Sequence, residues 1–173
     1  MKKIITILIF VVFSITAFAN TYTISEEGIN HIKKYESCSL TAYKDANGWS
    51  IGYGHHGSDV YEGMTITKAE ADEYFKKDIL KFKGCVKRLI EALPYEYEFS
   101  QGFIDGLYSL VYNCGERGVK TSTFYQRLLK CRVKNGVMNK SDFNFTIAGV
   151  KESKISAPGH IKRRHDEHLM MLK

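Results

Sequence analysis

The sequence predicts an α+β protein that is mainly helical, with a small β-hairpin near its N-terminus. Two observations predict this arrangement. Apolar residues recur at helical spacing over most of the chain after position 67, whereas the segment 40–53 places short extended runs on both sides of an Asn-Gly dipeptide. The length of 173 residues, with 44% hydrophobic residues and two prolines, fits a single folded domain without a long linker.

The first nineteen residues differ in kind from the rest. Lys2 and Lys3 precede an almost wholly apolar run at 4–18, and the run ends in Ala17-Phe18-Ala19, a small-x-small cleavage pattern. These features predict a secretory signal peptide at 1–19, followed by one domain at 20–173. The apolar run is shorter than the roughly 20 residues of a membrane-spanning helix, so we expect no stable membrane insertion after cleavage. An uncleaved anchor is the alternative. The expected location is exported, either periplasmic or secreted.

Export would place the four cysteines in an oxidising compartment. They are Cys38, Cys85, Cys114 and Cys131. Four cysteines in such a compartment predict disulfides, with three possible pairings, and we expect at least one; four reduced, buried thiols are the alternative. No two of them have CxxC spacing, which argues against a zinc site. The sequence contains no other metal or cofactor motif, so none is expected.

The first predicted helix begins after Ser25. Ser25 is a suitable N-cap, and the acidic residues at 26 and 27 lie in the first turn, where the helix dipole favours anions. Ile29 and Ile32 follow at helical spacing. Glu36 therefore falls at or near the C-terminal end of the helix. A carboxylate is disfavoured there by the helix dipole, which makes a purely structural role less natural.

A β-hairpin is predicted immediately after this helix. The strands are expected at Leu40–Asp45 and Trp49–Tyr53, joined by a two-residue turn at Asn47-Gly48. If Asn47 and Gly48 are the two turn residues, Asp45 lies directly opposite Ser50. The two side chains would then share one face of the sheet.

The rest of the chain is predicted to be helical. Thr67 and Glu70 form a capping box at the start of a long helix that Pro94 terminates. A second amphipathic helix holds Phe99 through Val111 and ends near Cys114-Gly115. Further helices are expected at 123–131, at 141–148 and from Pro158 to Leu172.

The formal net charge is +6, because 25 Lys and Arg outnumber 19 Asp and Glu. A basic protein favours anionic partners such as nucleic acids, membrane surfaces or acidic wall polymers, and the alternative is a generally basic surface without a specific partner. The basic residues are scattered along the chain, and export places the protein away from nucleic acid. Nucleic acid is therefore not an expected partner.

The residues around Glu36 and Asp45 resemble the phage-type lysozymes and endolysins. Tyr35-Glu36 is followed by Leu-Thr-Ala-Tyr-Lys-Asp at 40–45 and by Gly-Trp-Ser-Ile-Gly-Tyr-Gly-His at 48–55. The family pattern is Glu, Ala-Tyr-x-Asp, a Gly-containing turn, Trp-Thr and Ile-Gly-Tyr-Gly-His. The stretches 112–115, 122–124 and 159–167, the last with Gly-x-x-x-Arg-Arg, are also similar to the family. The resemblance covers most of 24–172 and implies a lysozyme-like fold in which the hairpin flanks the cleft.

The resemblance implies a peptidoglycan hydrolase that cleaves the β-1,4 bond between N-acetylmuramic acid and N-acetylglucosamine. Glycoside hydrolysis commonly uses two carboxyl groups on opposite sides of the bond. By the resemblance, Glu36 is the general acid and Asp45 assists on the other side of the sugar. Ser50 stands where the family has a Thr that supports the Asp or the attacking water, and the turn is one residue shorter than usual.

Other candidate site residues follow from the same resemblance. The candidate sugar contacts are His56, Tyr112, Ser122 and Thr123, of which Tyr112 could equally belong to the core. His55 is expected to pair with an acidic residue. Arg163 and Arg164 could bind wall carboxylates, form salt bridges or lie on a solvated face.

Two other functions are compatible with the sequence. The first is a catalytically weak module of the same fold that binds glycan without cleaving it. The second is a basic, membrane-active protein that kills by its charge. The pair Glu36 and Asp45 favours the hydrolase, and we expect a monomer that acts on bacterial glycan strands without a cofactor.

Overall fold

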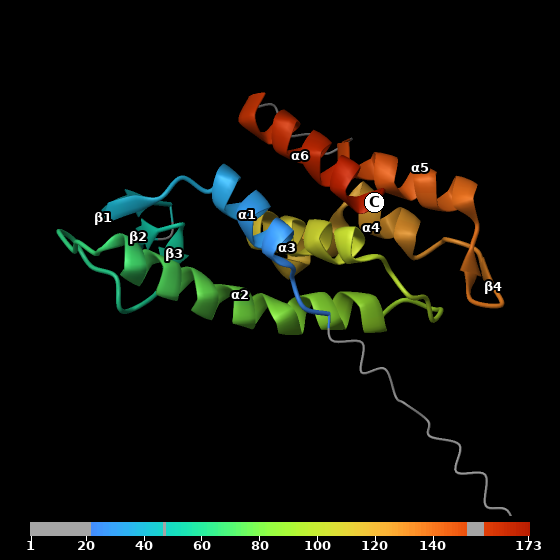
Figure 1. Ribbon diagram of the computed structural model, residues 1–173, viewed down its shortest axis with the longest axis horizontal. Helices are drawn as coiled ribbons and strands as arrows, with labels where there is room; N and C mark the ends of the chain where they lie inside the picture. The colour runs from blue at the N-terminus through green and yellow to red at the C-terminus, as the bar shows by residue number, and fades with distance from the viewer. Residues whose placement is uncertain (1–21, 47, 152–157) are drawn as a thin grey trace, which may run out of the picture.

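The computed structural model describes residues 22–46, 48–151 and 158–173. The predicted signal peptide at 1–19 and Asn47 of the predicted turn lie outside these residues. The described part has the predicted α+β architecture, with a small antiparallel sheet at one end of a mainly helical molecule (Figure 1). In chain order, the elements are α1 (Glu26–Tyr35), β1 (Ser39–Asp45), β2 (Gly48–Gly52), β3 (His55–His56), α2 (Lys68–Glu91), α3 (Gln101–Thr121), α4 (Thr123–Leu128), β4 (Val133–Lys134), β5 (Val137–Met138), α5 (Lys140–Lys151) and α6 (Pro158–Met171).

Helix α1 begins and ends where the sequence predicts. The side chain of Ser25 caps the helix by accepting a hydrogen bond from the backbone N–H of Gly28 at 3.2 Å. At the other end Glu36 is the C-cap, and its backbone N–H donates to the carbonyl of Ile32 at 2.9 Å. The Glu36 side chain therefore projects from the point where the chain leaves α1 for the sheet.

The hairpin forms as predicted, but its register differs from the predicted one. Strand β2 begins at Gly48, so Asp45 pairs with Gly48 and Tyr43 pairs with Ser50. The physical reason is that Gly48, with a φ of 134°, takes a strand position rather than a turn position. The residue numbers in each of the two observed pairs add up to 93, whereas the predicted pair of Asp45 and Ser50 adds up to 95. The observed register is therefore shifted by two residues from the predicted one. Because strand side chains alternate with a period of two, Asp45 and Ser50 remain on the same face, as diagonal rather than direct neighbours.

A third strand, β3, was not predicted. It pairs with β2, placing Ile51 opposite His55, and the sheet order is β1-β2-β3. Gly52 and Gly54 have φ values of 64° and 91° between the two strands, so the tight reversal depends on conformations that glycine adopts readily. A strand of two residues is too short to leave a periodic sequence signal.

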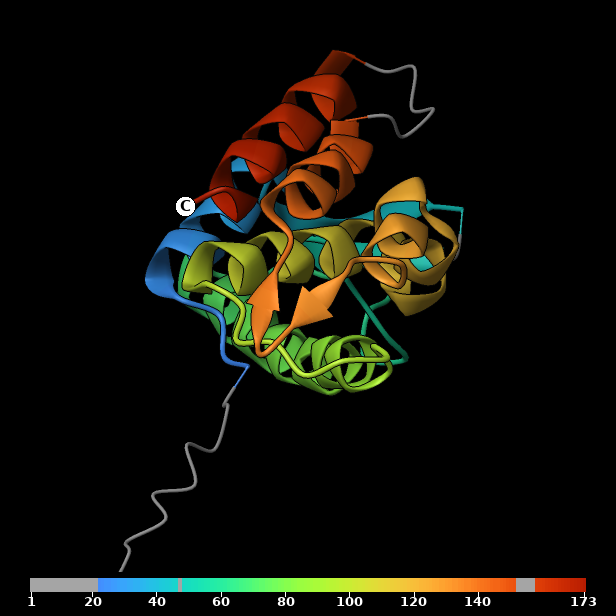
Figure 2. The ribbon, with the colours of Figure 1, turned by 90° about the vertical axis from the view of Figure 1, so that its right-hand side faces the viewer.

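The predicted N-terminus of α2 is confirmed, whereas α3 begins at Gln101, so Phe99, which was predicted to lie in this helix, precedes it. The capping box of Thr67 and Glu70 starts α2, and the N-cap Ser100 starts α3. Helix α3 was predicted to end near Cys114-Gly115. It has a break at Gly115, where φ is 67° and ψ is 166°, and a second helical stretch then continues to Thr121. Figure 2 shows α3 in the interior, between α2 on one side and α5 and α6 on the other. Its core side chains include Phe103, Leu107, Tyr108 and Val111.

The C-terminal helices cover the remaining side of α3. Helix α6 packs on α3 and on α5, and α5 packs on α4. The short hairpin of β4 and β5 was not predicted; Asn135 and Gly136 form its turn, both with positive φ. Within the described residues, each helix lacks the combination of length and apolarity that crossing a bilayer requires.

Candidate active site

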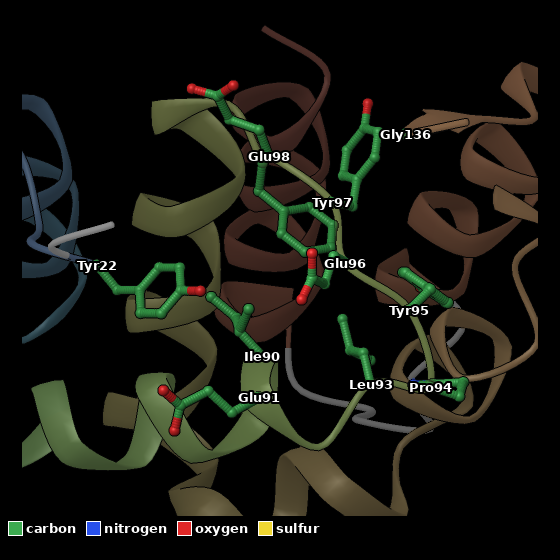
Figure 3. A pocket seen from close by; sticks show the side chains of 11 residues that line it. Tyr22, Ile90, Glu91, Leu93, Pro94, Tyr95, Glu96, Tyr97, Glu98 and Gly136 are labelled. Carbon is green, nitrogen blue, oxygen red and sulfur yellow. The ribbon is translucent and has the colours of Figure 1, made fainter. Parts of the chain in front are cut away.

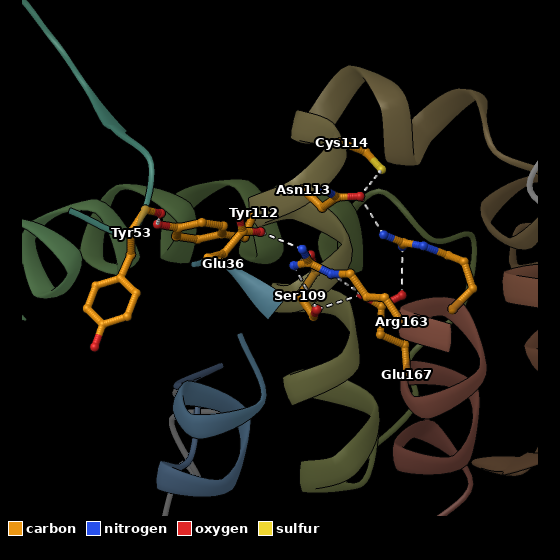
Figure 4. A network of polar contacts seen from close by, with 9 residues as sticks. Glu36, Tyr53, Ser109, Tyr112, Asn113, Cys114, Arg163 and Glu167 are labelled. Atoms are coloured by element: carbon orange, nitrogen blue, oxygen red, sulfur yellow. Dashed lines mark hydrogen bonds and ion pairs between the residues drawn. The ribbon is translucent and has the colours of Figure 1, made fainter. Parts of the chain in front are cut away.

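Glu36 lies between the first helix and the sheet, and α6 approaches it from the C-terminal part of the chain. Its side chain is 22% exposed. Arg163 of α6 donates a hydrogen bond from Nη1 to Glu36 Oε1 (Figure 4). Among the described residues this is the hydrogen-bonding contact of the Glu36 carboxyl, so Oε2 is left available to a ligand.

Asp45 and Ser50 are joined by a side-chain hydrogen bond. Ser50 Oγ donates to Asp45 Oδ2 at 2.5 Å. Ser50 is buried, with 1% of its surface exposed, whereas Asp45 stands exposed at the end of β1. A buried hydroxyl therefore orients a carboxylate that faces solvent, and the two side chains meet despite the different register.

Two tyrosines lie within electrostatic range of Glu36. Partial burial raises the pKa of Tyr43, and the nearby negative charges of Asp45 and Glu36 raise it further. Burial also raises the pKa of Tyr112, with Glu36 again adding to the shift. Glu36, directly after α1, and Asp45, at the end of β1, thus both act electrostatically on the Tyr43 phenol. A partly buried carboxyl and a second, exposed carboxylate are the kinds of group that acid–base chemistry on a polar bond uses.

The sequence did not identify Arg163 as the partner of Glu36. The solvated-face interpretation of Arg163 and Arg164 is wrong, since only 3% and 2% of their surfaces are exposed; the salt-bridge interpretation is confirmed. Arg163 is 127 residues from Glu36 along the chain. Local patterns carry no information about such a pairing, although the i,i+4 spacing of Arg163 and Glu167 could have indicated an ion pair on α6.

The two histidines after the hairpin have different environments. His55 is buried, and its Nδ1 lies 2.8 Å from Asp78 Oδ2, which confirms the predicted pairing with an acidic residue. Its ring also stacks on Tyr74. His56 is exposed, with Nδ1 3.0 Å from the carbonyl oxygen of Trp49. Of the two, His56 is the side chain that a bound molecule could reach.

The other candidate sugar contacts lie on or beyond α3. The Tyr112 hydroxyl donates to the carbonyl of Tyr53 at 2.8 Å, and the ring packs against aromatic side chains of α2. Ser122 ends α3 and caps α4, accepting from the backbone N–H of Tyr125. Thr123 is exposed in the first turn of α4. Tyr112 is therefore near Glu36 but largely packed, while no contact of Ser122 or Thr123 with the two carboxylates is present in the described part.

The expectation of a disulfide is wrong for this structure. All four cysteines are free thiols. They lie on separate elements, and three of them contact a polar group nearby: Cys85 contacts Arg88, Cys114 contacts Asn113 and Cys131 contacts Thr146. Burial raises the pKa of the Cys131 thiol, which keeps it in the less reactive protonated form.

A separate pocket of about 830 Å³ lies away from these residues, around the chain that joins α2 to α3 (Figure 3). Its lining includes Tyr22, Glu91, Tyr97 and Phe99, and none of the predicted site residues. Across residues 22–46, 48–151 and 158–173, no cluster of three or more His, Cys, Asp or Glu side chains could hold a metal ion.

Known proteins similar to this chain share its fold and its family pattern. The sequence family described as phage lysozyme matches residues 33–167. The endolysin of Acyrthosiphon pisum secondary endosymbiont phage 1 is 32% identical over 147 residues, which are 83% of this chain and 94% of the relative. The endolysin of Bacillus phage B103 is 32% identical over 86% of this chain and 54% of its own length. The chain spans about half or less of the first curated relatives it matches, with 39% and 40% of the length of three others.

Solved structures give the same result for the fold. The endolysin from Escherichia coli O157:H7 phage FAHEc1 superposes with a TM-score of 0.67 at 31% identity, over 87% of this chain and 94% of that one. The muramidase domain of SpmX from Asticaccaulis excentricus superposes with a TM-score of 0.71 at 22% identity, over 87% and 98% of the two chains. The second likeness concerns the fold alone. The helices and the small sheet described above are therefore those of lysozyme-like proteins.

Proposed function

The chain belongs to the phage lysozyme family, and from this premise we propose that the protein is a muramidase that cleaves the β-1,4 bond between N-acetylmuramic acid and N-acetylglucosamine in peptidoglycan. The main support is two carboxyl groups at the ends of neighbouring elements: Glu36 after α1, held by Arg163, and Asp45 at the end of β1, held by Ser50. Glycoside hydrolysis commonly uses two such carboxyl groups, one on each side of the scissile bond.

Glu36 acts as the general acid in this proposal. Its free oxygen donates a proton to the glycosidic oxygen, and the bond between that oxygen and the anomeric carbon breaks with its electron pair passing to the oxygen. Positive charge develops on the sugar ring. The ionised Asp45, oriented by Ser50, stabilises this charge from the opposite side. A water molecule adds to the anomeric carbon and loses a proton to a carboxylate, which completes the hydrolysis.

The substrate contacts are a further part of the proposal. His56 and Thr123 are exposed and available to hydrogen-bond sugar hydroxyl or acetamido groups. Tyr112 and Ser122 act mainly by supporting the walls of the site, since their polar atoms already have protein partners. The proposed binding region therefore runs from the sheet past Glu36 towards the start of α4.

We also propose that residues 1–19 direct export and that the domain at 20–173 acts as a monomer on the cell wall, in the periplasm or outside the cell. The support is the composition of the first nineteen residues: two lysines, an apolar run and a small-x-small sequence. The basic net charge of +6 would favour binding to anionic wall polymers.

The test compares Glu36→Gln with a matched control. Glu116 is the control position because its side chain is 21% exposed, against 22% for Glu36, and it also pairs with an arginine, Arg88. Clearing of a peptidoglycan suspension should fall at least about a hundredfold in Glu36→Gln. It should remain within about twofold of wild type in Glu116→Gln, because surface substitutions away from a site usually have small effects.

The products and the killing activity separate the alternatives. A muramidase releases fragments with reducing ends, which mass spectrometry distinguishes from anhydro ends by one water. If wild-type protein binds peptidoglycan but releases no fragments, it is a binding module. If Glu36→Gln still kills bacteria at the wild-type rate, the protein acts on membranes and the proposed function is wrong.

A further inference from the structure

The guanidinium of Arg163 is held by contacts to each of its three nitrogens (Figure 4). Nε donates to Glu167 Oε1 at 3.1 Å, and Nη2 donates to both the carbonyl oxygen and the Oγ of Ser109 at 3.2 Å. Nη1 is the nitrogen that donates to Glu36. A planar guanidinium with every nitrogen engaged has one orientation, so the position of Nη1 is set by the partners on the far side of Arg163.

Glu167 is the central partner on that far side. It is fully buried, and its Oε1 accepts hydrogen bonds from Arg163 and, at 2.6 Å, from Ser109 Oγ. Its Oε2 lies 2.7 Å from Nη1 of Arg164. Arg164 is in turn fixed by donating to Asn113 Oδ1 at 2.5 Å. Two donors therefore occupy Oε1, whereas Oε2 has an ion pair with Arg164 but no hydrogen bond among the described residues.

The ionised form of Glu167 fits these contacts. Burial raises the pKa of Glu167, while the two guanidinium groups favour its carboxylate. Oε1 accepts two hydrogen bonds and Oε2 lies beside a guanidinium nitrogen, so the surroundings offer Glu167 donors and positive charge. The buried cluster therefore has two cations, Arg163 and Arg164, against Glu167 and the partly exposed Glu36.

We propose that Glu167 is a positioning residue for Glu36, acting through Arg163. Its hydrogen bond fixes the guanidinium that contacts Glu36 Oε1, and its negative charge partly offsets the positive charge of Arg163 beside Glu36. The inference rests on the proposed function only in the last step, since the contact between the two carboxyl groups through Arg163 is independent of any substrate.

Without the charge of Glu167, the charge of Arg163 would be less compensated, and the carboxylate form of Glu36 would be favoured over the acid form. The groups that interact electrostatically with Glu36, Arg163 or Glu167 come from four elements. They are Arg164 from α6, Tyr112 and Cys114 from α3, Tyr43 from β1, and His31 and Tyr35 from α1. Only Glu167 changes charge in the experiment below.

The decisive variant is Glu167→Gln, which keeps the size and removes the charge. The ¹³C resonance of the Glu36 carboxyl, followed through a pH titration, reports its proton directly whether or not the protein cleaves glycan. We expect the titration of Glu36, and the alkaline limb of kcat/KM, to move to lower pH by roughly one pH unit. Glu167→Asp keeps the charge and should return both curves towards wild type.

Asp105→Asn is the matched control. Asp105 is also buried, with 2% of its surface exposed, and it also accepts hydrogen bonds from two elements through Ser25 and Gln101. It does not contact Arg163 in the described structure. This variant should lower thermal stability without moving the Glu36 titration, because it loses a buried charge outside the Arg163 cluster.

Removing a charge between two guanidinium groups can prevent folding, so Ser109→Ala provides a second test. It deletes the Oγ that donates to Glu167 and accepts from Arg163, without changing any charge. The expected result is a several-fold fall in kcat with KM nearly unchanged, because Arg163 would hold the Glu36 carboxyl in a less fixed position. An unchanged kcat in folded Ser109→Ala, or an unchanged Glu36 titration in folded Glu167→Gln, overturns the inference. If the wild-type protein releases no fragments while Glu167→Gln still shifts the Glu36 titration, the muramidase proposal is overturned and the positioning role of Glu167 stands.

Discussion

Ser50 donates a 2.5 Å hydrogen bond to Asp45, although the two residues are diagonal and not direct neighbours in the hairpin. The donor is buried and the acceptor is exposed. The sheet therefore supplies a fixed hydroxyl that restricts a surface carboxylate to one orientation. This contact gives Ser50 a role that depends on its hydroxyl and not on its place in the strand pairing.

Replacing Ser50 should separate the hydroxyl from the rest of the side chain. Ser50→Ala removes the donor, and we expect kcat to fall about tenfold, since a hydrogen bond to a charged group contributes roughly 1.5–3 kcal/mol. Ser50→Thr keeps the hydroxyl and should retain more activity than Ser50→Ala. Steady-state kinetics on soluble glycan fragments measure both. Equal kcat in wild type and Ser50→Ala would show that Asp45 needs no such support.

His31 should make the stability of the protein depend on pH. It is buried, and its Nε2 has no hydrogen-bond partner among the described residues. Burial, helped by the charge of Arg163, lowers its pKa from 6.5 to about 4. In the unfolded chain His31 therefore binds a proton near pH 6.5, whereas in the folded chain it binds one only near pH 4. Unfolding becomes easier as the pH falls through this window, by roughly 3 kcal/mol in total.

Urea unfolding of wild type and His31→Leu at several pH values measures this effect. The leucine variant should gain stability relative to wild type as the pH falls from 7 to 4, because it has no proton to bind at this position. His165→Gln, at an exposed position of α6, serves as the exposed-site control. A constant difference between wild type and His31→Leu across the window would contradict the assigned cause.

The sequence predicted the local features of this site, and it missed those that depend on distant contacts. Glu36 at the end of a helix and Asp45 beside a tight turn follow from capping and turn preferences, which act over a few residues. The hairpin register differed because glycine can occupy either a turn or a strand position. The pairing of Glu36 with Arg163, 127 residues away, arises only when α6 packs on α3. No local pattern encodes that packing.

His55 and Asp78 should contribute strongly to stability by joining β3 to α2. They are 5% and 9% exposed, and 2.8 Å separates Nδ1 from Oδ2. Asp78→Ala should lower the free energy of unfolding by about 3 kcal/mol, because it leaves a buried imidazole N–H without its acceptor. A double-mutant cycle with His55→Ala should give a coupling energy of about 1–3 kcal/mol. Additive effects of the two substitutions would mean that the contact is not stabilising.

Gly102 should tolerate no side chain, because α3 and α6 meet at this residue. An added Cβ would lie 2.3 Å from the carbonyl oxygen of Met170, a backbone atom that cannot rotate away. Helix propensity alone would favour Gly102→Ala by about 1 kcal/mol, whereas overpacking costs about 1–3 kcal/mol and should prevail. Gly84→Ala is the matched control: its Cβ would meet only the end of the flexible Arg88 side chain, at 3.4 Å. Urea unfolding should show Gly102→Ala destabilised and Gly84→Ala slightly stabilised. If both variants gained stability, α3 and α6 would not be in close contact at Gly102 and Met170.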